Sequence, residues 1–549
     1  MRTQLPKRPS LSIRRSHLGG PRVRGAQSKS VTLPAPVGGL NTRDGLTAME
    51  PNEAVLLENW FPSSTSVDTR KGYAVQTGTS ISGYIETLMA YSGETTSKLF
   101  AASSIGTIYD VTTADTLLVT EDDDFITTED GRVLVVQAAG SSASIASLSN
   151  GRFQYINFAN SGGNYLYIVN GTDSARHYNG TTWATPSITG VTSADLIHIN
   201  AHKRRIWFVE EGTLSAWYLA LDAINGTATE FDLKSFATRG GYLMAMATAT
   251  LDGGYGLDDL AVFITSKGQV LVYRGTDPSS ASTWALIGIW DIGSPVGRRC
   301  FYKWGGDLLI ITQEGITPLS QIMQASRTKQ SAFSDKIHPT LSEAVLDHGS
   351  KFGWQIIHYP NADALILNVP VQERMNQEQY VLNAATPAWA HFTGWDAGCW
   401  EVFKDDLYFG GFQLVAKAWT GTSDNGEVVE TLAVQAFSEL GAPGIQKRIT
   451  MLGNVLYTNG NLEIFGGVNV DYDTRPSTST LQIENSVYGL WDSGVWDTAI
   501  WGPDLDIRRS WNGASGVGNA FAPVLNTSNA NVQVQWVNST IIFEEGGFV

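Results

Sequence analysis

Apolar and polar residues alternate along LAVFITSKGQVLVYRGTD (260–277) in a pattern that predicts a β-hairpin. Residues 260–264 form an apolar run, 266–269 form a polar turn, and the apolar pattern resumes at 270–273. Alternating β-branched and aromatic residues on both sides of a glycine-bearing turn indicate a hairpin, because glycine adopts the positive φ that tight turns require. We therefore predict two paired strands here.

The same pattern recurs along the chain. Its counterparts lie at 98–113, 165–180, 205–220, 307–321 and 406–419, and ALILNV (364–369) adds a further strand. Turn glycines lie 65, 41, 56 and 47 residues apart, at Gly106, Gly171, Gly212, Gly268 and Gly315. The hairpin is therefore a repeating unit.

This spacing predicts four-stranded blades with insertions over residues 76–428. A β-propeller of about six blades buries each sheet against its neighbours and leaves only short edges, which keeps a long series of hairpins soluble. A series of β-sandwiches is the alternative. Both architectures place the chain in the all-β class.

The segments on either side of the repeats have a different character. In residues 31–75, MEPNEAVLLENW (49–60) is the best helix candidate, because Pro51 suits a first helical turn and residues 54–57 supply an apolar side. Residues 429–549 contain runs that predict strands separated by Asn, Ser and Gly turns. We expect them to form a second β domain outside the propeller.

Composition favours a turn-rich globular β protein. The 549 residues are 42% hydrophobic and 16% charged, with 56 glycines and 17 tryptophans. No apolar run reaches the roughly 18 residues of a membrane span. The basic opening lacks the apolar region of a secretory signal, so we expect a chain made in the cytoplasm. Cys300 and Cys399 lie far apart, which predicts buried free thiols.

Charge is distributed unevenly between a basic arm and an acidic body. Residues 1–30 hold eight Lys or Arg and no acid, so residues 31–549 carry a net charge of −24. Such an arm is either a solvated tail or a segment that docks on an acidic protein surface or on nucleic acid. We predict partner binding by the arm, with Lys7, Arg8, Arg14, Arg15, Arg22 and Arg24 as its contact residues.

Histidines and acidic residues form no complete metal motif. His198 and His202 lie four apart, but a zincin helix needs a glutamate after the first histidine, where Ile199 stands ahead of a predicted strand. Acidic groups at 121–124, 257–259 and 471–473 lack the remainder of a calcium loop. Scattered structural histidines and solvated loop acids explain these residues better, and we predict neither a metal nor another cofactor.

Other candidate motifs are incomplete as well. GASGVG (513–518) lacks the lysine of a phosphate-binding loop, and the chain contains no sialidase Asp box, GxSxG elbow or HExxH. Trp491, Trp496 and Trp501 are five residues apart, a spacing that does not keep them on one side of a strand, so they suit a core or a subunit contact better than a sugar platform. We expect a protein that is not an enzyme.

Five long strings carry a further signal. They lie at 35–73, 204–233, 253–299, 305–320 and 491–502, and include GGLN, AVLLENWFP and RKGY within 38–73. Together they resemble a family of virion proteins of short-tailed phages, the tail nozzle or tail tubular B-like proteins. The resemblance covers residues 35–549, whereas residues 1–30 depart from the family pattern.

The resemblance implies a six-bladed propeller with an added β-rich platform built from the N- and C-terminal segments. It also implies a homo-hexameric ring at the distal end of a virion tail, assembled in the host cytoplasm, through which double-stranded DNA passes without specific binding. The implied partners are a tail adaptor and tail fibres or a needle. The alternative is a receptor-binding or glycan-degrading propeller displayed on the tail, with a host surface receptor as its partner.

Overall fold

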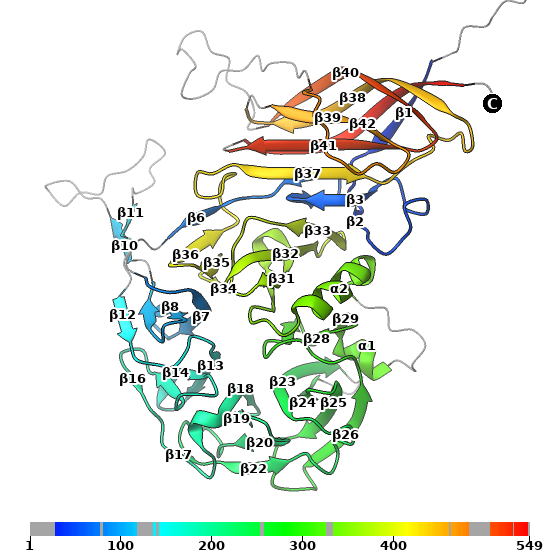
Figure 1. Ribbon diagram of the computed structural model, residues 1–549. Coiled ribbons are helices and arrows are strands. Elements are labelled where there is room, and N and C mark those ends of the chain that lie inside the picture. The colour runs from blue at the N-terminus through cyan, green and yellow to red at the C-terminus, as the bar shows by residue number, and fades with distance from the viewer. Residues whose placement is uncertain are drawn as a thin grey trace, which may run out of the picture.

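The computed structural model shows a chain built almost entirely of β-strands (Figure 1). Most strands pair antiparallel within small sheets, so the predicted all-β class is confirmed. No helix within the described ranges is long and apolar enough to cross a lipid bilayer. The structure describes residues 28–76, 81–112, 114–117, 135–138, 142–252, 257–324, 333–460, 463–481, 505–530 and 532–546.

All six predicted hairpins form. Their register is antiparallel in each case, as alternation around a short turn predicts. The pairs are β8 (Ser97–Ser103) with β9 (Ile108–Asp110), β14 (Gly163–Val169) with β15 (Arg176–Tyr178), β19 (Arg205–Glu210) with β20 (Ser215–Tyr218), β24 (Leu257–Thr265) with β25 (Gln269–Gly275), β28 (Asp307–Thr312) with β29 (Gly315–Pro318), and β35 (Asp406–Gly411) with β36 (Leu414–Ala418).

Two of the turns show why glycine is needed there. Gly106 has φ +77° and Gly268 has φ +76°, in the left-handed region that residues with a Cβ adopt at a cost. A Cβ on Gly268 would lie 2.3 Å from the carbonyl oxygen of Ile292, and a Cβ on Gly106 would lie 1.7 Å from that of Leu148. These glycines therefore allow the next segment of chain to pass against the turn.

The six hairpins belong to six sheets, and β30–β33 form a seventh; the seven sheets are numbered in chain order. Sheet 5 has three strands, and sheet 7 takes its last strand from the N-terminal segment. The orders are β12 (Ser142–Ile145)-β9-β8-β7 (Ile85–Ser92); β13 (Gln154–Asn160)-β14-β15-β16 (Trp183–Ala184); β18 (Leu196–His202)-β19-β20-β22 (Thr229–Asp232); β23 (Leu243–Asp252)-β24-β25-β26 (Trp284–Asp291); β27 (Phe301–Trp304)-β28-β29; β30 (Gln355–Tyr359)-β31 (Ala364–Gln372)-β32 (Met375–Asn383)-β33 (Ala388–Phe392); and β34 (Cys399–Phe403)-β35-β36-β6 (Tyr73–Val75).

The first strands of these sheets contact one another in a cycle. β7, β13, β18, β23, β27, β30 and β34 meet in that order, and β34 meets β7 again. Apolar clusters fill the spaces between sheets; Trp207 of sheet 3, for example, stacks on Trp284 of sheet 4 with ring centroids 5.6 Å apart. Such a cyclic order is typical of propeller blades. We call these seven sheets the ring.

Within the described residues, the ring has seven sheets, whereas the sequence predicted about six blades. ALILNV, interpreted as one additional strand, is part of β31 in the complete sheet 6. The turn from β31 to β32 contains Glu373 and Arg374 in place of glycine, and Arg374 adopts φ +67°. The glycine signal that marked the other hairpins is therefore missing from this one.

The predicted helix at 49–60 is wrong. Residues Glu53–Glu58 form strand β3, which pairs antiparallel with β37 (Val429–Gln435) and parallel with β2 (Gly39–Leu40). Pairing on both sides satisfies the backbone groups of β3, so tertiary context overrides the local helical signal. Among the residues that the structure describes, two α-helices lie in the region predicted to be propeller: α1 (Leu319–Gln324) and α2 (His338–His348).

Strands from both ends of the chain build a second unit, which we call the platform. Its outer sheet has the order β4 (Trp60–Pro62)-β5 (Val67–Thr69)-β42 (Val534–Glu545)-β38 (Lys447–Thr458)-β40 (Asp506–Gly518), with β1 (Ser28–Pro34) also paired to β42. Its inner sheet contains β2, β3, β37, β41 (Phe521–Asn529) and β39 (Ile464–Val470). Apolar residues such as Ile449, Ile541 and Phe521 are buried between the two sheets.

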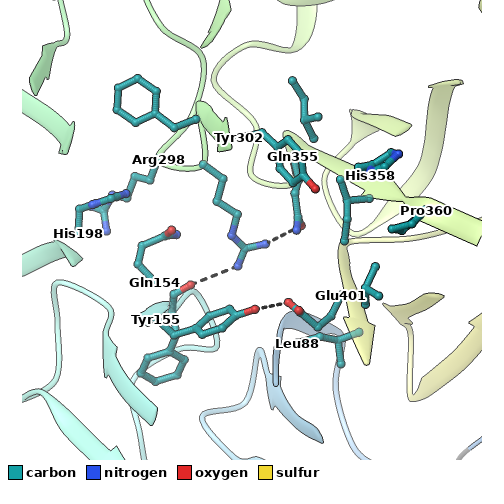
Figure 2. Close-up of a pocket in the computed structure, with 16 residues that line it drawn as sticks. Leu88, Gln154, Tyr155, His198, Arg298, Tyr302, Gln355, His358, Pro360 and Glu401 are labelled. Carbon is teal, nitrogen blue, oxygen red and sulfur yellow. Dashed lines mark hydrogen bonds between the residues drawn. The ribbon is translucent and has the colours of Figure 1, made fainter. Parts of the chain in front are cut away.

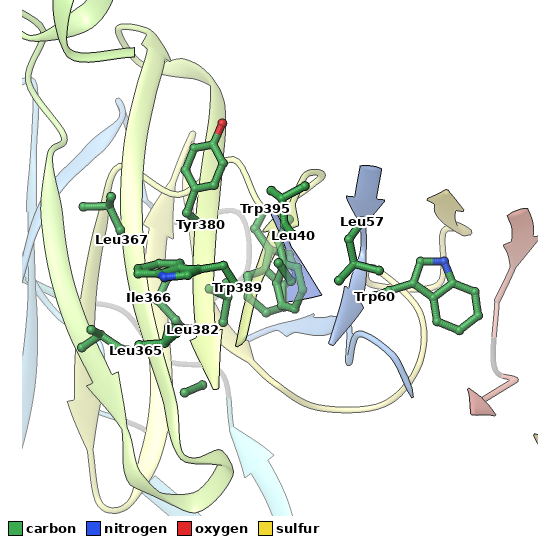
Figure 3. Close-up of a cluster of buried hydrophobic side chains, with 14 of the residues drawn as sticks. Leu40, Leu57, Trp60, Leu365, Ile366, Leu367, Tyr380, Leu382, Trp389 and Trp395 are labelled. Atoms are coloured by element: carbon green, nitrogen blue, oxygen red, sulfur yellow. The ribbon is translucent and has the colours of Figure 1, made fainter. Parts of the chain in front are cut away.

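The inner sheet of the platform continues into sheet 6 of the ring. β33 pairs with β3 through the bridge from Glu58 to His391, which joins β30–β33 and the platform strands into one nine-stranded sheet. The largest apolar cluster lies along this continuous sheet and includes Trp389 and Trp395 together with Leu57 and Trp60 (Figure 3). The ring and the platform therefore share both a sheet and a core.

Smaller elements lie beside these units. They are β10 (Ala114–Leu117) with β11 (Val135–Ala138), β17 (Ile188–Thr189) with β21 (Gly226–Thr227), and the 3-10 turns Ser193–Asp195, Asp335–Ile337 and Pro360–Ala362. Several predicted features lie outside the described residues: the acidic group at 121–124, the tryptophans Trp491, Trp496 and Trp501, and the arm residues Lys7, Arg8, Arg14, Arg15, Arg22 and Arg24. Only 28–30 of the predicted arm are described, and they belong to β1.

Candidate functional site

A cavity of about 460 Å³ lies at the centre of the ring. Its wall comes from the first strands β7, β13, β18, β27, β30 and β34, which are brought together from residues as distant as Leu88 and Val402. Figure 2 shows the side chains that converge there, with His198 and His358 on opposite sides. Among the described residues that line it, Glu401 is the one carboxylate, whereas Arg298 and Arg299 contribute two guanidinium groups.

Arg299 connects three sheets of the ring through acceptors that carry no charge. Its Nη2 donates to Thr87 Oγ1 at 2.7 Å and to the carbonyl oxygens of Glu86 and Phe153 at 3.1 and 3.3 Å. Its Nη1 donates to Gln355 Oε1 at 3.3 Å. Burial lowers the pKa of Arg299 because the guanidinium loses its water shell. Its cost of burial is therefore offset by hydrogen bonds and by carboxylates at longer range.

Glu401 and Tyr155 form a hydrogen-bonded pair across the cavity. The Tyr155 hydroxyl donates to Glu401 Oε2, and Figure 2 shows the two side chains pointing toward each other from sheets 2 and 7. Burial raises the pKa of Glu401 to about 7, although the bond from Tyr155 and the charge of Arg299 act in the opposite direction. Burial also raises the pKa of Tyr155 well above its ordinary value. Glu401 can therefore gain or lose a proton near neutral pH.

His198 faces the same cavity from β18. Burial, followed by the charge of Arg298, lowers its pKa to about 4, so the imidazole is neutral at pH 7. Its Nδ1 is buried without a hydrogen-bond partner among the described residues. His202 lies on the same strand, where its Nδ1 is 3.4 Å from Thr248 Oγ1. Both histidines lie on strand β18 and not on a zincin helix, and the strand predicted to follow them is β19.

A set of ion pairs beside the cavity connects sheets of the ring. The carboxylate of Glu86 is only 1% exposed and accepts hydrogen bonds from Arg152 Nε at 3.1 Å and Arg374 Nη2 at 2.9 Å. The guanidinium groups of Arg152 and Arg299 both lie over the ring of Phe352, 4.7 and 5.0 Å from its centroid. These contacts join sheets 1 and 2 to the chain around sheet 6. They hold the first strands of distant sheets at a fixed separation.

A second charged cluster lies at the joint between the platform and the ring. Arg70 is almost fully buried and makes two parallel bonds to Asp424, from Nη1 to Oδ1 at 2.8 Å and from Nη2 to Oδ2 at 2.5 Å. Its Nε donates to Asn59 Oδ1 at 2.8 Å, and Nη2 also donates to the carbonyl oxygen of Thr393. The guanidinium lies 4.9 Å from the ring centroid of Trp395. Arg70 therefore connects the N-terminal segment with sheets 6 and 7.

The sequence indicated only part of these clusters. Arg70 lies in the RKGY string that contributed to the family resemblance, and Arg299 in the quoted stretch 253–299, but neither was singled out. Glu401 and Tyr155 belong to no local motif. The two residues bond to each other although they lie 246 residues apart along the chain, so single-sequence spacing carries no signal for the pair.

Other predicted residues have structural surroundings. Cys300 and Cys399 are buried free thiols, as predicted, and burial raises the pKa of each to about 12. Residues 513–518 lie within strand β40, and Asp259 forms an ion pair with Lys203 at 2.8 Å. Among the described residues, no group of three His, Cys, Asp or Glu side chains is placed to share a metal ion.

Comparison with known protein families and with curated proteins identifies no match for this chain. The cavity combines one titratable carboxylate with two arginines and several aromatic rings. The joint is a fully paired ion bridge within a continuous core.

Proposed function

We propose that this chain is a structural virion protein of a short-tailed phage, which forms a hexameric tail nozzle through which genomic DNA leaves the particle. In this proposal the seven sheets of the ring are the blades of a propeller, and the platform carries contacts to neighbouring subunits and tail proteins. The role is suggested by the resemblance to the nozzle family that the sequence strings within residues 35–549 carry. The rigid junction between the ring and the platform is an independent argument for this role.

The observation that carries the proposal is the continuous nine-stranded sheet between ring and platform. Two domains joined only by a linker move relative to each other by default. Here β33 pairs with β3, and the Arg70–Asp424 bridge fixes the same junction from inside the core. A rigid junction of this kind suits a component that must keep its shape while DNA moves past it.

The charge of the chain also suits a conduit. Residues 31–549 carry a net charge of −24, which is −144 for six copies. Each Lys or Arg contact with a phosphate adds salt-sensitive affinity and would slow a moving duplex. An acidic body avoids such contacts. Double-stranded DNA would therefore pass without specific binding.

The proposed partners are a tail adaptor on one side of the ring and tail fibres or a needle around it. The basic arm, residues 1–30, is the proposed strap to a neighbouring tail protein, because its charge is opposite to that of the body. Deletion of residues 1–27 leaves β1 in place and should leave the fold intact while it impairs incorporation into particles. Normal incorporation of that variant would contradict the strap.

Light scattering on the purified full-length chain tests the nozzle. We expect a closed assembly of six copies that binds duplex DNA only weakly and loses that binding as salt rises. A chain that stays monomeric at every concentration and hydrolyses a bacterial polysaccharide would contradict the proposal. The same preparation serves for both measurements.

The central cavity favours a second candidate, a receptor-binding or glycan-degrading propeller. Tyr155, Tyr302 and Glu401 offer aromatic and carboxylate groups of the type that bind sugars. Glycoside hydrolysis by the common mechanisms needs two carboxylates, about 5–10 Å apart, and the described lining provides one. Binding without hydrolysis is therefore the stronger form of this alternative. Glycan binding that disappears in Glu401→Gln would support it.

A further inference from the structure

In the outer sheet of the platform, two strands each have one edge that pairs with no other described strand. Four strands lie side by side in the order β1, β42, β38 and β40 (Figure 1). Within the described part of the chain, β40 pairs only with β38, and β1 pairs only with β42. A strand edge presents free N–H and C=O groups, which are a template for another chain. Among the strands that the structure describes, this sheet therefore has one open edge on each side.

The outward face of β40 carries apolar side chains that a solvent-facing edge strand does not need. Ile507, Trp511 and Val517 are 54, 51 and 60% exposed, and Met451 on the neighbouring β38 is 37% exposed. Trp511 is the one exposed tryptophan in the described ranges. Its ring covers Gly453 of β38, where a Cβ would come within 2.9 Å of the indole. Exposed tryptophan beside an open edge is typical of a protein interface.

We propose that β40 of one subunit pairs with β1 of a second copy of this chain, so that the outer sheets of neighbouring subunits join into one. This inference rests on the proposed ring assembly and identifies its subunit contact. The contact is heterologous, because it uses two different edges, and heterologous contacts close into rings when the rotation permits.

Strand direction supports this pairing. Each adjacent pair among β1, β42, β38 and β40 is antiparallel, so β40 runs opposite to β1. Rotation about an axis roughly parallel to the strands preserves their direction. It therefore brings β1 of the next copy against β40 in antiparallel orientation, and the alternation continues across the contact.

The register of the sheet also places the two edges at the same height. Thr32 pairs with Thr540, Thr540 with Gly453, and Gly453 with Trp511, in one row across four strands. Two rows further along, Ser30, Ile542, Met451 and Gly513 lie side by side. A rotation that keeps height therefore sets Ser30 of one copy opposite Gly513 of the next.

Charge favours a second copy of the chain as the occupant. In the proposed orientation, residue 28 of the second copy lies near Gly518, so its residues 1–27 begin there with seven Lys or Arg and no acid. Gly518 pairs with Lys447, around which Glu439, Asp471 and Glu545 lie close enough to act on its charge. Burial lowers the pKa of Lys447 and these carboxylates oppose that shift. The basic arm therefore starts beside an acidic end of its neighbour.

Cysteine cross-linking of the full-length chain tests the contact. A Cβ on Gly513 meets no atom within 4 Å and Ser30 is exposed, so Gly513→Cys and Ser30→Cys should both fold. The natural thiols, Cys300 and Cys399, are buried and protonated, so they do not compete for a maleimide. The two single variants, their mixture and the double variant are treated with a short bis-maleimide and separated under denaturing conditions.

We expect the mixture to give cross-linked dimers and the double variant to give a ladder of products that ends at six copies. Each single variant should give neither. Dimers from Gly513→Cys alone would show that β40 pairs with itself and would overturn the inference. A six-copy mass without these cross-links would overturn the contact but leave the nozzle intact. A monomer at every concentration would overturn both.

A charge substitution on the face of β40 provides a second readout. Trp511→Lys should weaken assembly by more than about tenfold in the concentration at half-association, with an unchanged thermal midpoint. Ile287→Lys is the matched control, because Ile287 is 40% exposed on β26 of the ring. Equal weakening by both variants, or by neither, would contradict the proposed contact.

Discussion

Two arginines inside this protein each join segments that are distant in sequence, but they balance their charge differently. Arg70, at the joint between platform and ring, makes two bonds to the carboxylate of Asp424. Arg299, at the axis of the ring, donates to uncharged acceptors of Glu86, Thr87, Phe153 and Gln355, the partners that the described part of the chain provides. The joint is therefore a closed ion pair, whereas the axis is a network whose net charge depends on Glu401.

The difference shows which part of the molecule is fixed and which can respond to its surroundings. Removal of either partner of a buried ion pair leaves an isolated charge, so the joint tolerates little change. The axis contains a carboxyl whose pKa is about 7. Its protonation changes near neutral pH without loss of any covalent or sheet contact. The joint is therefore suited to transmit force between the platform and the ring, whereas the axis can change its charge with pH.

The largest effect should follow from breaking the joint. Arg70→Met keeps the length of the side chain and leaves Asp424 buried without its partner, which should lower the free energy of unfolding by about 3–5 kcal/mol. Denaturant titration followed by tryptophan fluorescence measures the loss. The double variant Arg70→Met/Asp424→Asn should lose less than the sum of the two single variants, because the two residues interact directly.

An exposed ion pair is the matched control for that prediction. Arg475 bonds Asp473 through two nitrogens, with its side chain 83% exposed. Arg475→Met should leave the free energy of unfolding nearly unchanged, since surface pairs contribute little. An equal loss from Arg70→Met and Arg475→Met would remove the distinction between the joint and the surface.

Substitution at the axis should cost less than at the joint. Arg299→Met leaves neutral acceptors without a donor but breaks no direct bond to a carboxylate. We therefore expect a loss of about 1–3 kcal/mol in the free energy of unfolding. The same denaturant titration measures it. A loss larger than that of Arg70→Met would reverse the comparison.

The third prediction concerns pH. The pKa of Glu401 is raised from 4.5 to about 7, so between these values the folded state holds a proton that the unfolded state has released. Stability from this group is complete below about pH 4.5 and is lost as pH rises through about 7, with a slope of at most ~1.4 kcal/mol per pH unit.

Glu401→Gln should flatten that slope, because an amide does not titrate. Denaturation midpoints of the natural chain and the variant are compared at half-unit steps over this window. An unchanged slope in the variant would show that Glu401 does not titrate there. Arg475→Met again serves as the control and should keep the natural slope.

The smallest expected effect follows from Tyr155→Phe. This change removes the hydroxyl that bonds Glu401 and costs about 1 kcal/mol. Because that bond lowers the pKa of Glu401, its loss should move the pH transition of stability to higher values. A shift toward lower pH in the same titration would contradict the assigned hydrogen bond.

The sequence predicted the local part of the fold and missed the part that depends on distant contacts. The six hairpins were accessible because their strands and turn glycines lie within about 20 residues of each other. Residues 49–60 carried a helical signal that pairing with β37 and β2 overrides. Sheet 7 needs Tyr73–Val75, which pairs with β36 more than 300 residues later. No local pattern indicates such a closure.

The candidate site was less accessible than the fold. Arg70 lay within a recognisable string, but its partner Asp424 is 354 residues away. Glu401 acquires its raised pKa from burial among three sheets, which no residue near it in sequence reveals. The open edges of β1 and β40 likewise become visible only when the sheet order is known. Long-range pairing therefore creates each of these features.

Single-particle electron microscopy of the purified full-length chain tests the central claim most directly. The nozzle proposal predicts closed rings of six copies around a channel wide enough for duplex DNA, with β1 and β40 of adjacent copies in contact. Isolated monomers, or dimers related by a twofold axis through β40, would contradict it.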